Sequence, residues 1–312
     1  MTNVYYERRV DDDTRREQIY NGGLFVYAPN EASMELVNLA REVLTEGFGG
    51  IDPRIAQHHM EAAEYARILT PVKKKFIEHP RCLEIQPRIL ASLGCNLNDV
   101  HFDIPRMRSA TSDGYLSSGI AYQFHPHRDT WYSAPMCQIN WWIPIFEIEA
   151  ANAMAFHPKY WDQPVDNNSE TYNYQHWNST QRYTAHQHIK KDTRPQPHAL
   201  EDLEIEPNVV IVLPPGGMLL FSAAQLHSTL PHSTGVTRYS IDFRTVHRGD
   251  LESIKGAKNI DSKCTGSAIN DYRRGTDLSR LPQSLQDRYM PRHPQPIEAA
   301  SPVRKVVVPM DG

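Results

Sequence analysis

The spacing of apolar residues along the chain changes near residue 100. Before that point, apolar side chains recur every three or four positions, which is the spacing of the buried face of a helix. Asn30 or Ser33 is placed to cap the first of these helices, which we expect to end near Phe48. The elements expected here are a polar lead-in, a strand and three helical stretches, over about residues 1–22, 23–27, 33–48, 54–78 and 83–93.

After residue 100 the pattern changes to short runs of β-branched and aromatic residues separated by Gly, Pro, Ser or Asn. Runs of this kind are typical of strands, and their close succession favours an antiparallel sandwich or barrel. The strand-like segments are residues 101–109, 120–127, 137–146, 153–157, 208–213, 217–223 and 236–246.

The segment 158–207 shows neither period and mixes Trp and Tyr with Asn, Gln, His and Thr. A loop of this length in a compact domain is usually functional or disordered, and the aromatic content predicts an ordered lid. We therefore expect a single domain. It has an N-terminal helical flank at 1–99, a β core at 100–246 that carries this insert, and a C-terminal extension at 247–312 whose polar tail wraps the surface.

Composition and charge narrow the class of protein. Hydrophobic residues make up 40 % of the chain and charged residues 22 %, which is typical of a chain that buries a core. The formal charge of −4 argues against a duplex nucleic-acid binder, although a local basic groove stays open. No apolar run approaches the roughly 20 residues that span a bilayer. The 4 cysteines form no CxxC pair, so we expect reduced thiols. From the charge and the short apolar runs we expect a cytoplasmic protein that binds neither nucleic acid nor membrane.

The 15 histidines prompt a search for metal ligands. His127 and Asp129 lie two positions apart, so on a strand their side chains point to the same face. An imidazole and a carboxylate need a second histidine to form the facial 2-His-1-carboxylate site of non-haem iron enzymes. His227, which follows an apolar run, is the expected third ligand. A His-x-Asp pair alone occurs by chance in such a composition.

The strand expected over 236–246 supports a ligand site because its apolar and polar side chains alternate closely. A core strand rarely carries a polar row unless that row faces a ligand. The guanidinium of Arg238 and the hydroxyl of Ser240 share a face, which suits bidentate capture of a carboxylate. An ion pair between Arg238 and Asp242 is the structural alternative. The polar face consists of Arg238, Ser240, Asp242 and Arg244.

With these features the sequence resembles the non-haem Fe(II)/2-oxoglutarate-dependent dioxygenases, and among them the phytanoyl-CoA hydroxylase-like branch. The resemblance covers about residues 23–246, without the insert. It rests on five features in the family's order. They are the strand and helix that start at Gly23, the His-Arg-Asp of 127–129, the segment from Asn152 to Pro158, the Pro-Gly turn, strand and histidine of 214–227, and Arg238 with Ser240 two residues later.

The resemblance implies an α+β fold, mainly β with flanking helices, around a double-stranded β-helix (jelly-roll) core. It also implies that His127, Asp129 and His227 bind Fe(II) and are the catalytic residues, with 2-oxoglutarate and O2 as co-substrates. Arg238 would pair with the far carboxylate of 2-oxoglutarate. Halogenating relatives replace the metal-binding carboxylate with a small residue, so Asp129 favours hydroxylation. The other expected co-substrate contacts are Ser240, Thr229 and Asn140.

Each residue expected to contact substrate also has a structural alternative. Arg106 and Arg108 alternate along one strand and would meet an anionic substrate, or else lie solvated on an edge strand. His125 forms a His-x-His pair with His127, as in cupin metal sites, but the glutamate of that pattern is missing downstream. We expect His125 at the rim of the cleft, and the aromatic residues either in the cleft or in the core. The candidates are Arg106, Arg108, His125, Trp131, Tyr132 and Trp177.

The polar and aromatic insert favours a small or medium hydrogen-bonding substrate, such as an amino-acid derivative, a sugar or a natural-product intermediate, over a fatty acyl chain. The expected reaction is hydroxylation with release of succinate and CO2. Desaturation, epoxidation or ring formation by the same family are alternatives, as is a cupin-like metal-dependent isomerase or binding protein. A nucleic-acid demethylase of the superfamily is disfavoured by the net charge of −4. A homodimer is the default oligomeric state.

Overall fold

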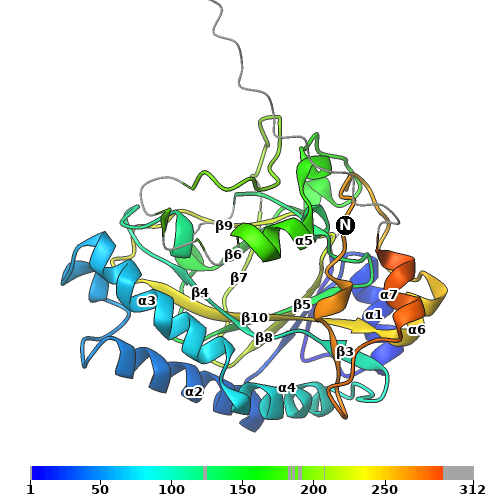
Figure 1. Ribbon diagram of the computed structural model, residues 1–312, viewed down its shortest axis with the longest axis horizontal. Coiled ribbons are helices and arrows are strands. Elements are labelled where there is room, and N and C mark those ends of the chain that lie inside the picture. Colours follow the sequence, from blue (N-terminus) through cyan, green and yellow to red (C-terminus); the bar gives the residue numbers. More distant parts are fainter. Residues whose placement is uncertain are drawn as a thin grey trace, which may run out of the picture.

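The computed structural model describes residues 2–121, 125–181, 184, 187–188, 192–206 and 208–290, which form a mixed α/β structure (Figure 1). The larger of its two sheets has the strand order β1-β2-β8-β5-β10-β3-β11, and β4 also pairs with β10. The smaller sheet has the order β7-β6-β9. The larger sheet comprises β1 (Val4–Tyr6), β2 (Leu24–Tyr27), β3 (Val100–Phe102), β4 (Arg106–Ala110), β5 (Ile139–Pro144), β8 (Met218–Ser222), β10 (Arg238–His247) and β11 (Arg273–Arg274), and the smaller one β6 (Met154–Phe156), β7 (Val209–Ile211) and β9 (His227–Thr229).

Helices cover one face of the larger sheet, and the smaller sheet lies on its other side (Figure 1). Helices α2, α3 and α4 pack side by side along that face. Helix α1 contacts β8, and helix α6 contacts β10. The helices of the described residues are α1 (Asp12–Tyr20), α2 (Glu31–Gly47), α3 (Ala62–Ile77), α4 (Pro80–Ser92), α5 (Tyr174–His176), α6 (Arg248–Ser253) and α7 (Gln283–Tyr289).

The N-terminal elements follow the apolar pattern closely. Strand β2 and helix α2 are confirmed, and Asn30 caps α2 in a reciprocal capping box with Ser33. Helix α3 starts later than predicted because Glu61 has an extended backbone (φ −74°, ψ 151°), and only a 3-10 turn over Ala56–His58 precedes it. The polar lead-in also contains regular structure, since it holds β1 and α1.

The two faces of β10 meet different surroundings. Its apolar side chains Tyr239, Ile241 and Phe243 are fully buried in the core that α2, α3 and α4 share with the sheet. On the opposite face, the guanidinium of Arg238 lies 5.5 Å from the ring centroid of Trp142, which belongs to a second core between the sheets. The polar row of β10 therefore faces the smaller sheet, and there Asp242 and Arg244 keep partial exposure.

The segment 120–127 corrects one predicted strand. Its residues 122–124 lie outside the described residues. Within 125–127 the only strand-like pairing described is a bridge between His127 and His227. Arg128 has an extended backbone, and a 3-10 helix, Asp129–Tyr132, follows directly. His127 and Asp129 therefore do not share a strand. Strand β9, which carries His227, was not among the predicted strands.

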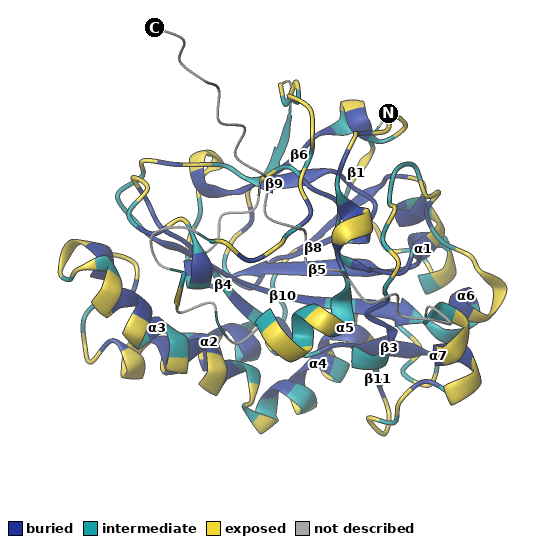
Figure 2. Cartoon of the chain, turned by 45° about the horizontal axis from the view of Figure 1, so that its top comes forward, coloured by how far each residue is buried: buried dark blue, intermediate teal, exposed yellow. Residues whose placement is uncertain are grey.

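The C-terminal extension also differs from its prediction, because part of it enters the core instead of wrapping the surface. Tyr272, Leu281 and Leu285 are at most 6 % exposed and pack in the large helix–sheet core. Figure 2 shows α7 beside β3 and β11 of the larger sheet, with both buried and exposed residues. Within the described part of the chain, no helix combines the length and apolar character needed to cross a bilayer.

Candidate metal centre

Three side chains from two distant segments of the chain converge between the two sheets. His127 and His227 pair through their backbones, with both N–O distances at 3.0 Å, and their ring centroids are 4.4 Å apart. The 3-10 turn after Arg128 places Oδ1 of Asp129 3.4 Å from Nε2 of His127. One possible ligand atom from each of the three residues lies within 4.8 Å of the other two. The structure thus assembles the predicted His-Asp-His group without the predicted strand.

The hydrogen bonds of the two imidazoles decide which nitrogen faces the centre. Nδ1 of His127 donates to the carbonyl oxygen of His125 at 2.8 Å, and Nδ1 of His227 donates to that of Gln225 at 3.0 Å. Since a carbonyl oxygen only accepts, both Nδ1 atoms carry a proton, and in the neutral form of each ring the lone pair lies on Nε2. Burial, together with the nearby His127, lowers the pKa of His227 to about 4, so its neutral, ligating form prevails at neutral pH.

The third group is the carboxylate of Asp129, which is ionised and hydrogen-bonded on the side away from His127. Burial opposes ionisation of Asp129, yet its contacts with His127, His227 and Arg244 hold the pKa of its carboxyl below the usual range. Asn140 Nδ2 donates to Asp129 Oδ2 at 2.8 Å. A carboxylate oxygen and an imidazole lone pair only 3.4 Å apart repel unless a cation or a proton lies between them. This donor set fits a divalent metal ion.

A chain of amide and hydroxyl groups extends from Asn140 to the C-terminal extension. Gln138 Nε2 donates to Asn140 Oδ1 at 2.7 Å, and the hydroxyl of Tyr272 donates to Gln138 Oε1 at 2.6 Å. All donors in this chain point toward Asp129, so each bond favours the ionised carboxylate. Sequence reasoning missed Gln138 and Tyr272. The alternation of Gln138 with Asn140 on one face of a strand was an available signal, whereas nothing local marks Tyr272.

Arg238 is buried on the same interior face, with Nε and Nη1 free of any hydrogen-bond partner among the described residues. The hydroxyl of Ser240, two residues along the same face of β10, also has no such partner. The predicted alternative, an ion pair with Asp242, is not formed, because Asp242 Oδ2 accepts from Arg108 Nε at 2.5 Å. Burial lowers the pKa of Arg238 to about 10. An unpartnered guanidinium and hydroxyl side by side suit the carboxylate of a small anion.

The arginines expected to meet substrate both lie in ion pairs. Arg106 pairs with the buried carboxylate of Asp103 at 2.5 Å and lies 3.9 Å from Asp271. Arg108 pairs with Asp242 and keeps 33 % of its side chain exposed. Neither is a solvated edge arginine. Asp103 also accepts from Arg244, so charges of both signs alternate on this wall of the interior.

The aromatic candidates separate into a core residue and a row beside the metal ligands. Trp131 has no exposed surface and its indole Nε1 donates to Asp261 at 2.8 Å, so we correct its assignment from substrate contact to packing. Tyr132 lies edge-on to His127 at 5.4 Å between ring centroids, Tyr172 follows at 5.3 Å, and Trp177 at 5.8 Å from Tyr172. Tyr172, which sequence reasoning did not select, links the metal centre to the insert.

The remaining candidates have definite positions. Asn140 touches Asp129 directly, and Thr229 follows His227 by two residues on β9, half-buried. His125 is exposed and contributes its carbonyl to His127. It also lines a cavity of about 670 Å³ whose walls come mainly from the insert and include the ion-paired Asp192 and Arg194. None of the three metal-ligand candidates lines that cavity, but His125 and Pro126 of its wall directly precede His127.

Neither a protein-family model nor a curated protein sequence matches the chain. Among solved structures, the chain is similar to the non-heme monooxygenase ThoJ, with 13 % identity over 70 % of this chain and 71 % of that one and a TM-score of 0.37. It is also similar to the non-heme alpha-ketoglutarate-dependent epimerase SnoN from nogalamycin biosynthesis (16 % identity, 76 % and 84 % covered, TM-score 0.37). A third is EvdO2 from Micromonospora carbonacea var. aurantiaca (14 % identity, 56 % and 62 % covered, TM-score 0.35). Similarity this distant does not define an activity, which has to be argued from the site.

Proposed function

We propose that this chain is an Fe(II)- and 2-oxoglutarate-dependent oxygenase, and that its two facing sheets are the double-stranded β-helix of that class. One observation carries the proposal: two imidazole nitrogens and an ionised carboxylate converge in the same interior that holds a buried arginine with two unpartnered nitrogens. A metal site and a separate carboxylate site in one interior match the two ends of a 2-oxo diacid.

In this proposal the ligands are Nε2 of His127, Nε2 of His227 and a carboxylate oxygen of Asp129. When bound, Fe(II) with 2-oxoglutarate supplies the activation of O2 that yields succinate, CO2 and an oxidised substrate. Asn140 fixes the orientation of the Asp129 carboxylate. Three ligands from the protein leave coordination positions open for the co-substrates.

Arg238 and Ser240 bind the far carboxylate of the co-substrate. The indole of Trp142 lies against the guanidinium and excludes water from one side of it, which strengthens its attraction for an anion. Thr229 is a further candidate for this contact. A cupin-like isomerase or binding protein would need the metal ligands, but its function does not require a buried arginine without hydrogen-bond partners. Arg238 therefore favours the oxygenase.

The substrate that fits this interior is a small or medium polar molecule. Tyr132, Tyr172 and Trp177 offer aromatic surface beside the metal ligands, while the wall of β4 and β10 presents paired arginines and aspartates. Such a wall, rich in donors and acceptors, favours a hydroxyl- or amide-bearing substrate over a fatty acyl chain. Hydroxylation is the proposed outcome.

The test is an anaerobic titration of the apo-protein with Fe(II) and then with 2-oxoglutarate. The proposal expects the weak visible absorption band of a metal-chelated 2-oxo acid. Asp129→Ala should lose the band, and Arg238→Met should need a higher 2-oxoglutarate concentration to reach it. Bound iron without any band in the wild-type protein would favour the cupin-like alternative, and no bound iron would refute the metal centre.

A further inference from the structure

Arg128 stands between two of the metal-ligand candidates in the sequence and is fully buried, with its guanidinium engaged on every side. Its Nη1 donates to the carbonyl of Ala224 at 2.6 Å, three residues before His227. Its Nη2 donates to the carbonyls of Tyr160 at 2.5 Å and Gln163 at 3.0 Å, where the insert begins. One side chain thus connects the metal-ligating turn, the approach to the distal histidine and the start of the insert.

The counter-ion of Arg128 is Asp261, in the C-terminal extension. Arg128 Nε donates to Asp261 Oδ2 at 2.9 Å, and both side chains are at most 3 % exposed. Asp261 also accepts from the indole Nε1 of Trp131 at 2.8 Å and from the backbone N–H of Val165 at 3.0 Å. The carboxylate therefore binds the residues on both sides of Asp129 and the insert at the same time.

We propose that Arg128 and Asp261 are positioning residues that couple metal binding at His127 and Asp129 to the docking of the insert and the C-terminal extension. Since Arg128 links the two ligands directly, a shift of its guanidinium displaces the turn that holds them. Metal affinity rises when ligands are held in place before binding. By reciprocity, a metal that fixes the turn also stabilises the segments bonded to Arg128 and Asp261. The inference rests on the proposed metal centre.

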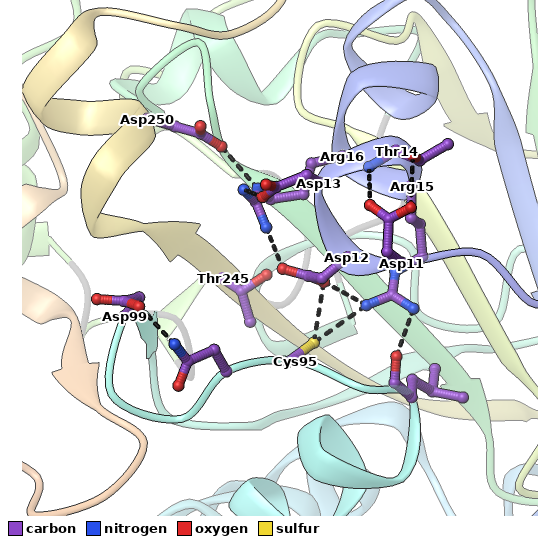
Figure 3. A network of polar contacts seen from close by, with 12 residues as sticks. Asp11, Asp12, Asp13, Thr14, Arg15, Arg16, Cys95, Asp99, Thr245 and Asp250 are labelled. Carbon is purple, nitrogen blue, oxygen red and sulfur yellow. Dashed lines mark hydrogen bonds and ion pairs between the residues drawn. The ribbon is translucent and has the colours of Figure 1, made fainter.

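A second buried pair supplies a matched control. Arg16 Nε donates to Asp250 Oδ2 at 2.7 Å (Figure 3). The hydroxyl of Tyr20 donates to the same carboxylate at 2.8 Å. Both side chains are 7 % exposed. Like Asp261, Asp250 accepts from one arginine Nε and one aromatic donor. Its bonds tie α1 to α6, and none of them reaches a metal-ligand candidate or the insert.

The experiment compares full-length wild type, Asp261→Asn and Asp250→Asn. Affinity for Ni(II) alone is measured by calorimetry, and amide hydrogen exchange is followed with and without Ni(II). We expect both variants to unfold at lower temperature, since each breaks a buried ion pair. Only Asp261→Asn should lose about tenfold or more in Ni(II) affinity. In the wild type, Ni(II) should slow exchange at 160–165 and 261–264 but not at 12–20, and Asp261→Asn should abolish this protection.

Arg128→Lys is a second variant for the case in which Asp261→Asn does not fold. It keeps the charge opposite Asp261 but cannot reach three carbonyls at once, so it should weaken Ni(II) binding with a smaller effect on folding. Unchanged affinity in a folded Asp261→Asn or Arg128→Lys protein overturns the inference alone. An equal loss in Asp250→Asn also overturns it, because the effect is then one of general stability. No Ni(II) binding by the wild type overturns both the proposed metal centre and this inference.

Discussion

The side-chain amide of Asn140 donates to Oδ2 of Asp129 at 2.8 Å, so the oxygen that faces His127 is Oδ1. On sequence grounds Asn140 was expected to contact the co-substrate. Its position behind Asp129, continued by Gln138 and Tyr272, assigns it instead to the orientation of a metal ligand.

Asn140→Leu should weaken metal binding about tenfold, because Asp129 loses the donor that fixes its rotamer. Calorimetric titration with Ni(II) and anaerobic titration with 2-oxoglutarate separate the two possible roles. Tyr272→Phe, which removes the last donor of the chain, should lose less than Asn140→Leu. Weaker 2-oxoglutarate binding at unchanged metal affinity would restore the original assignment of Asn140 to the co-substrate.

Asp129→Ala should abolish metal binding without unfolding the apo-protein. The carboxylate supplies the only negative charge among the three ligands, whereas the substitution removes little buried apolar surface. A thermal melt with and without Ni(II) is the measurement. The wild type should melt at a higher temperature with metal, since a ligand that binds only the folded state stabilises it, and the variant should show no shift. A shift of wild-type size in Asp129→Ala would place the metal elsewhere.

Arg238→Met should make the apo-protein more stable while weakening 2-oxoglutarate binding. The wild-type guanidinium is buried with two nitrogens unpartnered, a cost that the methionine removes, and the gain should be about 1–3 kcal/mol. Urea unfolding of the apo-proteins measures it. Arg108→Met is the opposite control, since it breaks the pair with Asp242 and should destabilise. A destabilised Arg238→Met would mean that Arg238 has a structural partner.

The stability of the protein should rise with pH above neutrality because of Lys73. Burial, followed by the nearby Arg108, lowers the pKa of this lysine from 10.5 to about 7. Between these two values the unfolded chain binds the proton and the folded chain does not, so folding becomes more favourable as pH rises, by up to about 1.4 kcal/mol per unit. Below pH 7 this contribution is constant.

Urea unfolding of wild type and Lys73→Met at pH 7, 8 and 9 checks this slope, as the difference between the two proteins. The free energy of unfolding of the wild type, minus that of Lys73→Met, should increase as the pH rises. Parallel curves would show that Lys73 stays protonated, held by its hydrogen bonds to Ser109 and to the carbonyl of Ile120.

Elements that depend on neighbours in the sequence were predicted well. The cap at Asn30, one of the two expected, follows from residue type, and the two faces of β10 follow from spacing, because a strand repeats its exposure with a fixed period. The segment around Asp129 was misread as a strand, since a turn of four residues in a 3-10 helix is too short to show a period.

The sequence by itself determined the helical first third, most of the strands and the candidate ligands, because residue type and spacing carry that information. Tertiary structure decided which groups have partners. Arg108 instead of Arg238 pairs with Asp242, Trp131 binds Asp261, and Tyr272 reaches Asp129 through two amides. These pairs join residues more than 100 positions apart, and only the packing of the sheets and the C-terminal extension brings them within hydrogen-bonding distance. The unpartnered Arg238 is therefore a property of the fold.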